Sequence, residues 1–235
     1  MDTVFMIIIV YGFVVSLPFV FIYFGSRKYN ESNYKAASGK TFSNLLFEKG
    51  CMGEYKLYKV LERLEGNNKI LTNLYVPRPN GQLTEIDMIM INKKGMYVFE
   101  SKDYSGWIFG SEKQKMWTQV LNKRKKNRFL NPIIQNKIHI DALKNALHFE
   151  SQLMYHSFVI FGERSILKDV KVVSDEVRVI NRIKLRETLT NDSNRFSSSL
   201  SDQEINMLYQ KLLTYTMQSD AIKKAHIASL KSPMK

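Results

Sequence analysis

The hydrophobic pattern opens with a run that has no charged residue, from Val4 to Phe24. About 20 apolar residues are enough for a helix to cross a bilayer, and a proline such as Pro18 is tolerated there. The segment lacks the basic start and small-residue cleavage site of a signal peptide. It therefore predicts a transmembrane anchor over residues 1–28. Because Arg27 and Lys28 follow the run, the positive-inside rule predicts a single-pass protein of the cell membrane with a cytoplasmic C-terminal part.

The pattern then changes from continuous to periodic. Residues 29–40 are polar and predict a short linker. Apolar side chains recur at i+3 and i+4 spacings from Thr41 to Leu64, which predicts an amphipathic helix with glycines at positions 50 and 53 where it can break. Three strands are expected next, at Ile70–Val76, Ile86–Ile91 and Met96–Lys102. The second of them is nearly all apolar, which is typical of a central strand buried on both faces.

The rest of the chain predicts a return to helix and strand. Asn131-Pro132 is a strong helix start, because Asn caps free N–H groups and Pro suits the first helical position. This helix is expected to reach about Leu147. The other expected elements are short strands at Trp107–Phe109 and Trp117–Leu121, strands at Phe158–Phe161 and Val177–Ile180, a polar connection at Asn191–Ser201 and a helix at Gln203–Met217. We therefore predict an α/β fold with a mixed sheet flanked by helices, with one domain at residues 41–150 and elements at 151–235 that complete or extend it.

Charge narrows the classes of partner. The 235-residue chain has a formal net charge of +13, which favours nucleic acid, anionic lipid or another acidic partner. The single Cys51 excludes an intrachain disulfide. The strongest basic run is either a solvated hairpin tip, a contact for phosphates or a contact for anionic lipid, and its candidate nucleic-acid-binding residues are Lys123, Arg124, Lys125, Lys126 and Arg128.

The candidate chemistry lies on two neighbouring strands. Side chains alternate along a strand, so Glu100 and Lys102 point the same way, and the turn at residues 92–95 folds Asp87 back beside them. A carboxylate such as Asp87 in an apolar strand is costly unless it is paired or bound to a metal. Two carboxylates and an ammonium predict a site for a divalent metal and water. The alternative is a structural ion-pair cluster.

The segment from about Cys51 to Leu147 resembles the nuclease-related domain (NERD) family. The resemblance rests on an ordered set of motifs, which are Gly53-Glu54, Thr84-Glu85-Ile86-Asp87, Gly95 to Lys102, Tyr104 to Gly110, Trp117, and Asn131-Pro132 with Gln135. The family is similar to the PD-(D/E)xK nuclease superfamily. The resemblance thus implies a restriction-endonuclease-like αβββαβ core, which agrees with the element order above.

The resemblance also implies roles for the matched positions. Asp87 and Glu100 would be metal ligands together with the backbone carbonyl of Ser101, and such hard oxygen donors suit Mg²⁺ or Mn²⁺. Lys102 would orient the attacking water and stabilise charge on the phosphate. Glu54 matches a helix-borne acidic residue that contacts the metal or water.

Several residues have competing interpretations. Gln135 matches a polar residue that approaches the site from the second helix, and its alternative is a helix–sheet hydrogen bond. Glu54 has the alternative of an ordinary helix-surface residue. Two tryptophans, Trp107 and Trp117, are expected in the core. The histidines show no metal-ligand spacing and are expected to be structural, and they are His139, His148, His156 and His226.

Taken together, these features predict a membrane-anchored, metal-dependent nuclease that hydrolyses phosphodiester bonds in DNA or RNA. The first alternative is a non-catalytic module that binds nucleic acid or another partner and is tethered at the membrane. A further alternative is a structural protein whose basic loop contacts lipid. The sequence does not distinguish DNA from RNA and does not define an oligomeric state.

Overall fold

The chain divides into two compact units, residues 1–48 and 49–235. The computed structural model describes residues 3–121, 125–147, 155–195 and 200–216, and for part of the first helix it describes the backbone alone.

The first unit is helical. It contains α1 (Thr3–Asn30), α2 (Asn33–Ser38) and α3 (Phe42–Phe47). The Tyr29 ring at the end of α1 is 1% exposed and packs against Tyr34 and Phe42, while its hydroxyl donates to the carbonyl of Lys40 at 3.0 Å. A short helix therefore occupies part of the segment where a linker was expected, because a Tyr pair gives it an apolar contact.

The transmembrane anchor predicted over residues 1–28 has no support here. Among the residues that the structure describes, no helix is long and apolar enough to cross a membrane. The helix also continues past the apolar run to Asn30, and its last turn belongs to the packed Tyr29 contact of the first unit.

The second unit contains the predicted αβββαβ order. Its core elements are α4 (Cys51–Leu61), β1 (Lys69–Pro77), β2 (Leu83–Asn92), β3 (Gly95–Lys102), α5 (Pro132–Leu147) and β7 (Tyr155–Phe161). The expected single helix over 41–64 is instead two helices, because Gly50 adopts φ +89° before α4 begins. This is one of the two glycines at which a break was predicted.

The main sheet is mixed and has the strand order β1-β2-β3-β7-β9, with β9 at Val177–Asn181. Strands β1, β2 and β3 are antiparallel neighbours, whereas β7 pairs parallel with both β3 and β9. Its two faces are covered by different helices. Ile89 and Val98 pack in one core with side chains of α5 and of α7 (Asp202–Leu213). Tyr97 points to the opposite face, because neighbouring strand residues alternate.

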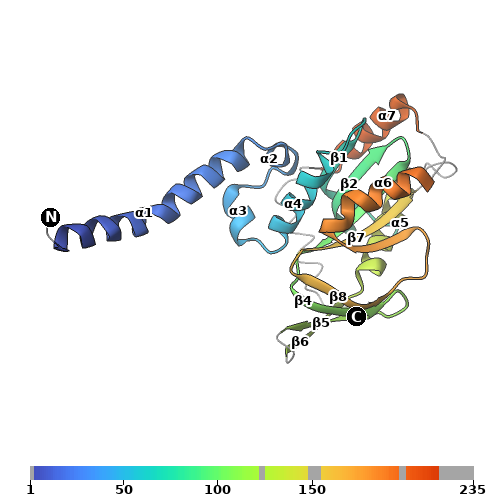
Figure 1. Cartoon of the computed structure of the whole chain (residues 1–235). Coiled ribbons are helices and arrows are strands. Elements are labelled where there is room, and N and C mark those ends of the chain that lie inside the picture. Colours follow the sequence, from blue (N-terminus) through green and yellow to red (C-terminus); the bar gives the residue numbers. More distant parts are fainter. Residues whose placement is uncertain (1–2, 122–124, 148–154, 196–199, 217–235) are drawn as a thin grey trace. The chain divides into compact units, whose positions relative to one another are not determined.

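A smaller mixed sheet lies below the larger one in Figure 1. It has the order β6-β5-β4-β8, formed by β4 (Gly106–Ser111), β5 (Met116–Leu121), β6 (Lys125–Leu130) and β8 (Ser165–Lys171). Trp117 is fully buried and stacks on Phe161 at 6.3 Å, so it belongs to the core as predicted. Trp107 is half-buried, with the ammonium of Lys168 5.7 Å from the centre of its ring.

The C-terminal part contains elements that the pattern did not predict. Besides β8, these are the short helix η1 (Arg182–Lys184) and α6 (Leu185–Arg195). The expected polar connection over 191–201 therefore begins as helix. Helix α6 is poor in apolar residues, but Leu185 and Leu189 are one turn apart and both buried. Helix α7 ends four residues before the predicted Met217, which lies outside the described residues.

Candidate active site at the open end of the β2–β3 hairpin

The candidate site lies where strands β2 and β3 stop pairing. Their ladder runs from the Asn92 and Gly95 pair at the turn to the Met88 and Phe99 pair. One residue further on, Asp87 accepts a hydrogen bond from the backbone N–H of Ser101 at 2.8 Å. The Asp87 side chain thus takes the place of a ladder bond and lies beside the start of the Glu100-Ser101-Lys102 segment.

Glu100 is the most enclosed carboxylate of this group, with 4% of the residue exposed. One oxygen, Oε1, is 2.5 Å from the Lys102 ammonium. The other, Oε2, is 3.0 Å from Nε2 of His139 on α5. Because buried charges are stable only when they are paired and hydrogen-bonded, these two contacts explain how a carboxylate persists in the core.

His139 is the residue that the sequence assigned to a structural role without a place at the site. Its second ring nitrogen, Nδ1, is 2.8 Å from the hydroxyl of Thr84, so Thr84, His139 and Glu100 form a continuous buried chain of hydrogen bonds. The histidines of the sequence show no metal-ligand spacing, so this criterion did not indicate His139 as a site residue. A signal does exist, because His139 lies four residues after Gln135 and therefore on the same side of the second helix.

Helix α4 brings Glu54 toward the strands from its first turn. Glu54 is 9% exposed and interacts electrostatically with Asp87. The preceding glycine allows this approach: a Cβ at Gly53 would lie 2.8 Å from Cβ of Asp103 and 3.2 Å from Oγ of Ser101. The Gly53-Glu54 motif is therefore a close helix–strand contact followed by an acidic side chain, and Glu54 is not the exposed surface residue of the alternative interpretation.

The two strand carboxyls have opposite pKa shifts. Burial raises the pKa of Asp87 well above its usual value, and the charges of Glu100 and Glu54 raise it further. Burial also raises the pKa of Glu100, but Lys102 and the His139 hydrogen bond outweigh it and bring this pKa to about 2. Burial lowers the pKa of Lys102, whereas Glu100 and Asp87 reverse that effect and raise it. The site thus contains a Lys102–Glu100 ion pair beside Asp87, whose pKa is raised by burial and by the two neighbouring carboxylates.

The oxygen donors of the site are of the type that a hard divalent cation binds. The charges of Glu100 and Glu54 both disfavour the ionised form of Asp87, and a bound cation would relieve this repulsion. The Ser101 hydroxyl is also buried and has no hydrogen-bond partner among the residues described. Within that same part of the chain, no group of three His, Cys, Asp or Glu side chains is arranged to hold a metal ion. Both oxygens of Glu100 are already engaged, and the expected third ligand is a backbone carbonyl.

Helix α5 begins at Pro132, after the Asn131 cap that the sequence predicts. Oδ1 of Asn131 accepts from the N–H of Ile133 at 2.9 Å, and its Nδ2 donates to the carbonyl of Gln114 at 2.7 Å. Gln135 is half-buried, and no hydrogen bond of its side chain occurs among the described residues. The helix–sheet hydrogen bond comes instead from Asn136, whose Nδ2 donates to the carbonyl of Val98 at 2.8 Å.

The predicted nucleic-acid-binding run lies on the smaller sheet. Lys125, Lys126 and Arg128 are exposed on its edge strand β6, whereas Lys123 and Arg124 lie outside the described residues. No ion pair joins the three described residues to the carboxylates of the candidate site. His148 and His226 also lie outside the described part, and His156 stacks on the ring of Tyr97 with 4.4 Å between ring centres.

The second unit is an α/β protein whose mixed sheet carries acidic residues and a lysine at the open end of a hairpin. The model of the nuclease-related domain matches residues 49–162. An uncharacterized protein of Bacillus anthracis is 34% identical over 183 residues, which is 77% of this chain and 84% of that protein. Residues 49–162 of this chain therefore form a nuclease-related domain. No solved structure matches the chain.

Proposed function

We propose that the protein hydrolyses phosphodiester bonds in DNA or RNA with Mg²⁺ or Mn²⁺ at the centre formed by Asp87, Glu100 and Lys102. The observation that carries the proposal is the convergence of these side chains and Glu54 at one end of the β2–β3 hairpin. Family membership supports a nuclease-like fold. Fold likeness alone does not establish chemistry, so the side chains carry the argument.

Each residue of the centre has a role in the proposed hydrolysis. Asp87 and Glu100 would hold the metal ion with the Ser101 carbonyl, and the bound ion would supply Lewis-acid catalysis and an acidified water. The ammonium of Lys102 is fixed by Glu100 and supplies positive charge where a phosphate develops negative charge. His139 fixes the second oxygen of Glu100 and so positions the carboxylate.

The experiment is cleavage of DNA and RNA substrates by the full chain in Mg²⁺, in Mn²⁺ and in chelator. We expect cleavage only with metal, and a loss of about 100-fold or more in Asp87→Ala and in Lys102→Ala. Cleavage that persists in chelator, or equally in both variants, would contradict the proposal.

A second candidate is a binding module that holds nucleic acid without cleaving it. The observation in its favour is that both oxygens of Glu100 are already occupied by protein partners. It predicts retained nucleic-acid binding with no cleavage under any metal, and binding that is unchanged in Asp87→Ala. Membrane anchoring by the N-terminal helix is not supported by the structure. The cytoplasmic location expected from the sequence stays a prediction, and neither candidate function depends on it.

A further inference from the structure

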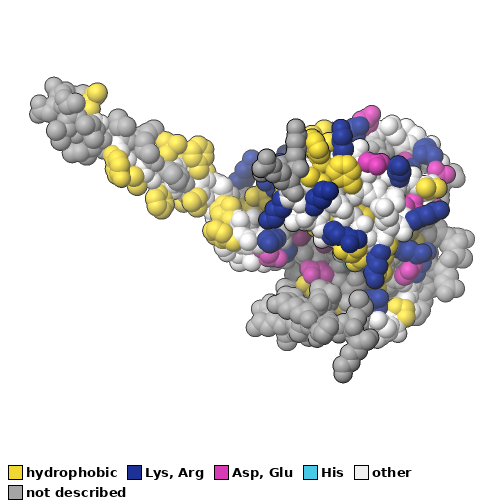
Figure 2. All heavy atoms as spheres, turned by 90° about the horizontal axis from the view of Figure 1, so that it is seen from below, with side chains coloured by type: hydrophobic (Ala, Val, Ile, Leu, Met, Phe, Trp, Pro, Cys, Tyr) yellow, Lys and Arg dark blue, Asp and Glu magenta, His cyan; other side chains and the backbone are white. Residues whose placement is uncertain are grey.

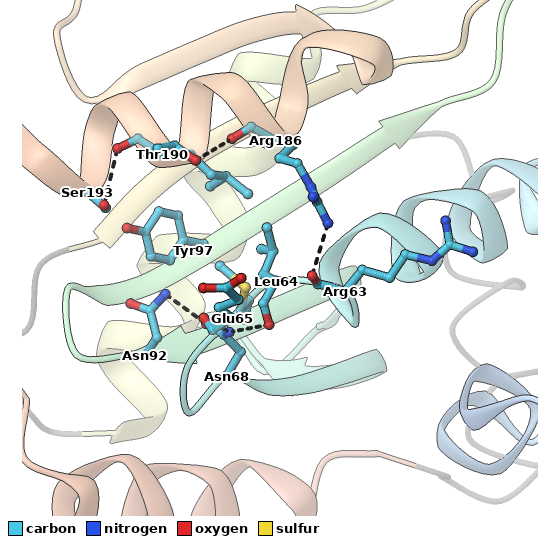
Figure 3. A pocket seen from close by; sticks show the side chains of 11 residues that line it. Arg63, Leu64, Glu65, Asn68, Asn92, Tyr97, Arg186, Thr190 and Ser193 are labelled. Atoms are coloured by element: carbon cyan, nitrogen blue, oxygen red, sulfur yellow. Dashed lines mark hydrogen bonds between the residues drawn. The ribbon is translucent and has the colours of Figure 1, made fainter.

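A hollow lies on the face of the main sheet opposite Glu100, near the β2–β3 turn (Figure 3). Its volume is about 340 Å³, within the range of small-molecule sites. The lining comes from the segment after α4, from strands β2 and β3, and from α6. Its apolar part includes Leu64, Met90 and Leu189, and its polar part includes Arg186, Glu65 and Tyr97.

Tyr97 is a buried side chain with an unused polar group in this hollow. The residue is 1% exposed, and its ring is held by His156 at 4.4 Å and by Phe158 at 5.7 Å between ring centres. In Figure 3 its hydroxyl points to the gap between Asn92 and Ser193, and it has no hydrogen-bond partner in the part of the chain that the structure describes. Burial, followed by the charge of Asp192, raises the pKa of Tyr97 to about 12, so the hydroxyl keeps its proton and remains a donor.

Arg186 supplies the positive charge. Its Nη2 donates to the carbonyl of Arg63 at 3.0 Å, which fixes the guanidinium at the rim (Figure 3). No carboxylate pairs with Arg186 or Arg63 among the described residues, and a second hollow of about 350 Å³ shares both arginines. The lining thus holds two arginines and one carboxylate, that of Glu65, which gives it a net positive charge.

We propose that this hollow binds a nucleotide unit, with its phosphate on Arg186 and its base or sugar against Tyr97 and Leu189. A guanidinium matches phosphate with two parallel N–H donors. The Tyr97 hydroxyl and the Glu65 carboxylate offer a donor and an acceptor to a base or a sugar. The anion site follows from the hollow itself, whereas the choice of a nucleotide rests on the proposed function of the Asp87 centre at the other end of the hairpin. The bound nucleotide can come from two sources, a free mononucleotide or the end of a nucleic-acid strand.

The test is calorimetric binding to the full chain in chelator, with adenosine monophosphate, a 5′-phosphorylated tetranucleotide and inorganic phosphate as probes. We expect saturable binding of a nucleotide probe that is at least about 10-fold tighter than that of inorganic phosphate. Arg186→Gln should weaken it by about 10- to 100-fold and Tyr97→Phe, which keeps the ring, by about 3- to 10-fold. Lys168→Gln, an exposed charge on the smaller sheet, and Asp87→Asn should bind as the unchanged chain does.

Either nucleotide source supports the inference: a tetranucleotide that binds about 10-fold tighter than the mononucleotide identifies a strand end, and equal affinities identify a free nucleotide. Three results would overturn it. They are no saturable binding of either nucleotide, binding unaffected by both Arg186→Gln and Tyr97→Phe, and inorganic phosphate binding as tightly as the nucleotide. Loss of binding in Asp87→Asn would overturn it too, because the ligand would then lie at the other site. Cleavage by the Asp87 centre without nucleotide binding here would refute this inference alone.

Discussion

At the scale of single residues, the site is defined by how Glu100 is paired. Lys102 contacts one oxygen and His139 the other, and Thr84 fixes the far side of the His139 ring. These hydrogen bonds and the ion pair explain why the Glu100 carboxylate is ionised although only 4% of the residue is exposed, whereas the pKa of nearby Asp87 is raised. The sequence predicts the two acids and the lysine. It does not predict the His139 contact, because a histidine four residues after Gln135 is equally typical of an ordinary core position.

Replacing His139 by Phe should destabilise the protein at pH 7. The variant removes one partner of a buried charge, so the free energy of unfolding should fall by about 1–3 kcal/mol. Because the pKa of Glu100 in the fold is about 2, below its usual 4.5, its contribution is present above about pH 4.5 and is lost as the pH falls toward 2. The measurement is urea unfolding across this range. His139→Gln, which keeps a donor, is the control, and equal stability of the Phe variant and the unchanged chain would refute the role of His139.

His156 should make the fold acid-sensitive. Burial lowers its pKa below the ordinary 6.5, and its Nε2 is 3.1 Å from the carbonyl of Lys94. Above pH 6.5 the His156 imidazole is neutral in both the folded and the unfolded protein, so it contributes nothing to the pH dependence of stability. As the pH falls below 6.5, the unfolded chain takes up the proton first, so stability decreases. His156→Phe, which keeps a ring beside Tyr97, should show a smaller decrease in unfolding free energy between pH 7 and pH 5, and an unchanged slope would contradict this account.

At the scale of elements, the contact between α4 and β3 sets the geometry of the site. Gly53 allows the helix to lie against Ser101 and Asp103, and the next residue, Glu54, then approaches Asp87. The motif is visible in the sequence, but the closeness of the two backbones is not, because it depends on a residue 50 positions further along the chain.

Gly53→Ala should therefore perturb both stability and the site. The added methyl would lie 2.8 Å from Cβ of Asp103, which forces the helix or the strand to move. Overpacking of this kind costs about 1–3 kcal/mol of unfolding free energy. Lys56→Ala, on the exposed side of the same helix, should change stability by less than about 0.5 kcal/mol. Thermal unfolding of the two variants measures the difference, and a Gly53→Ala protein as stable as Lys56→Ala would contradict the close contact.

The sequence predicts the elements up to β7 better than those after it. Strands β2 and β3 each contain a run of apolar residues, at Met88–Ile91 and Met96–Phe99, and α5 has a strong start at Asn131-Pro132. Strand β8 and helix α6 are mostly exposed and polar, so their local pattern carries little signal. Tertiary contacts stabilise α6 instead: Leu189 is buried, and the carboxylate of Asp192 binds Arg178 at 2.8 Å.

At the scale of the whole molecule, the net charge of +13 shapes the encounter with nucleic acid. Figure 2 shows lysines and arginines spread over this face of the second unit rather than gathered at one place. The basic strand β6 is one part of this distribution, and its exposed side chains are candidates for phosphate contacts.

Neutralising β6 should weaken nucleic-acid binding in a salt-dependent way. If Lys125, Lys126 and Arg128 each contact one phosphate, their replacement by Gln should reduce the slope of log affinity against log salt by about 3 on duplex DNA. The matched control replaces three other exposed lysines by Gln, namely Lys168, Lys171 and Lys184. Fluorescence anisotropy at several salt concentrations measures both slopes. Equal losses in the two triple variants would mean that β6 has no special role.

We propose above that Asp87 belongs to a metal-dependent hydrolytic centre. The most direct measurement is the rate of nucleic-acid cleavage in Mn²⁺ by Asp87→Asn, which preserves size and removes the charge, beside Asp169→Asn on the exposed face of β8. We expect a loss of about 100-fold or more for Asp87→Asn and an unchanged rate for Asp169→Asn. Equal cleavage rates in the two variants would contradict it.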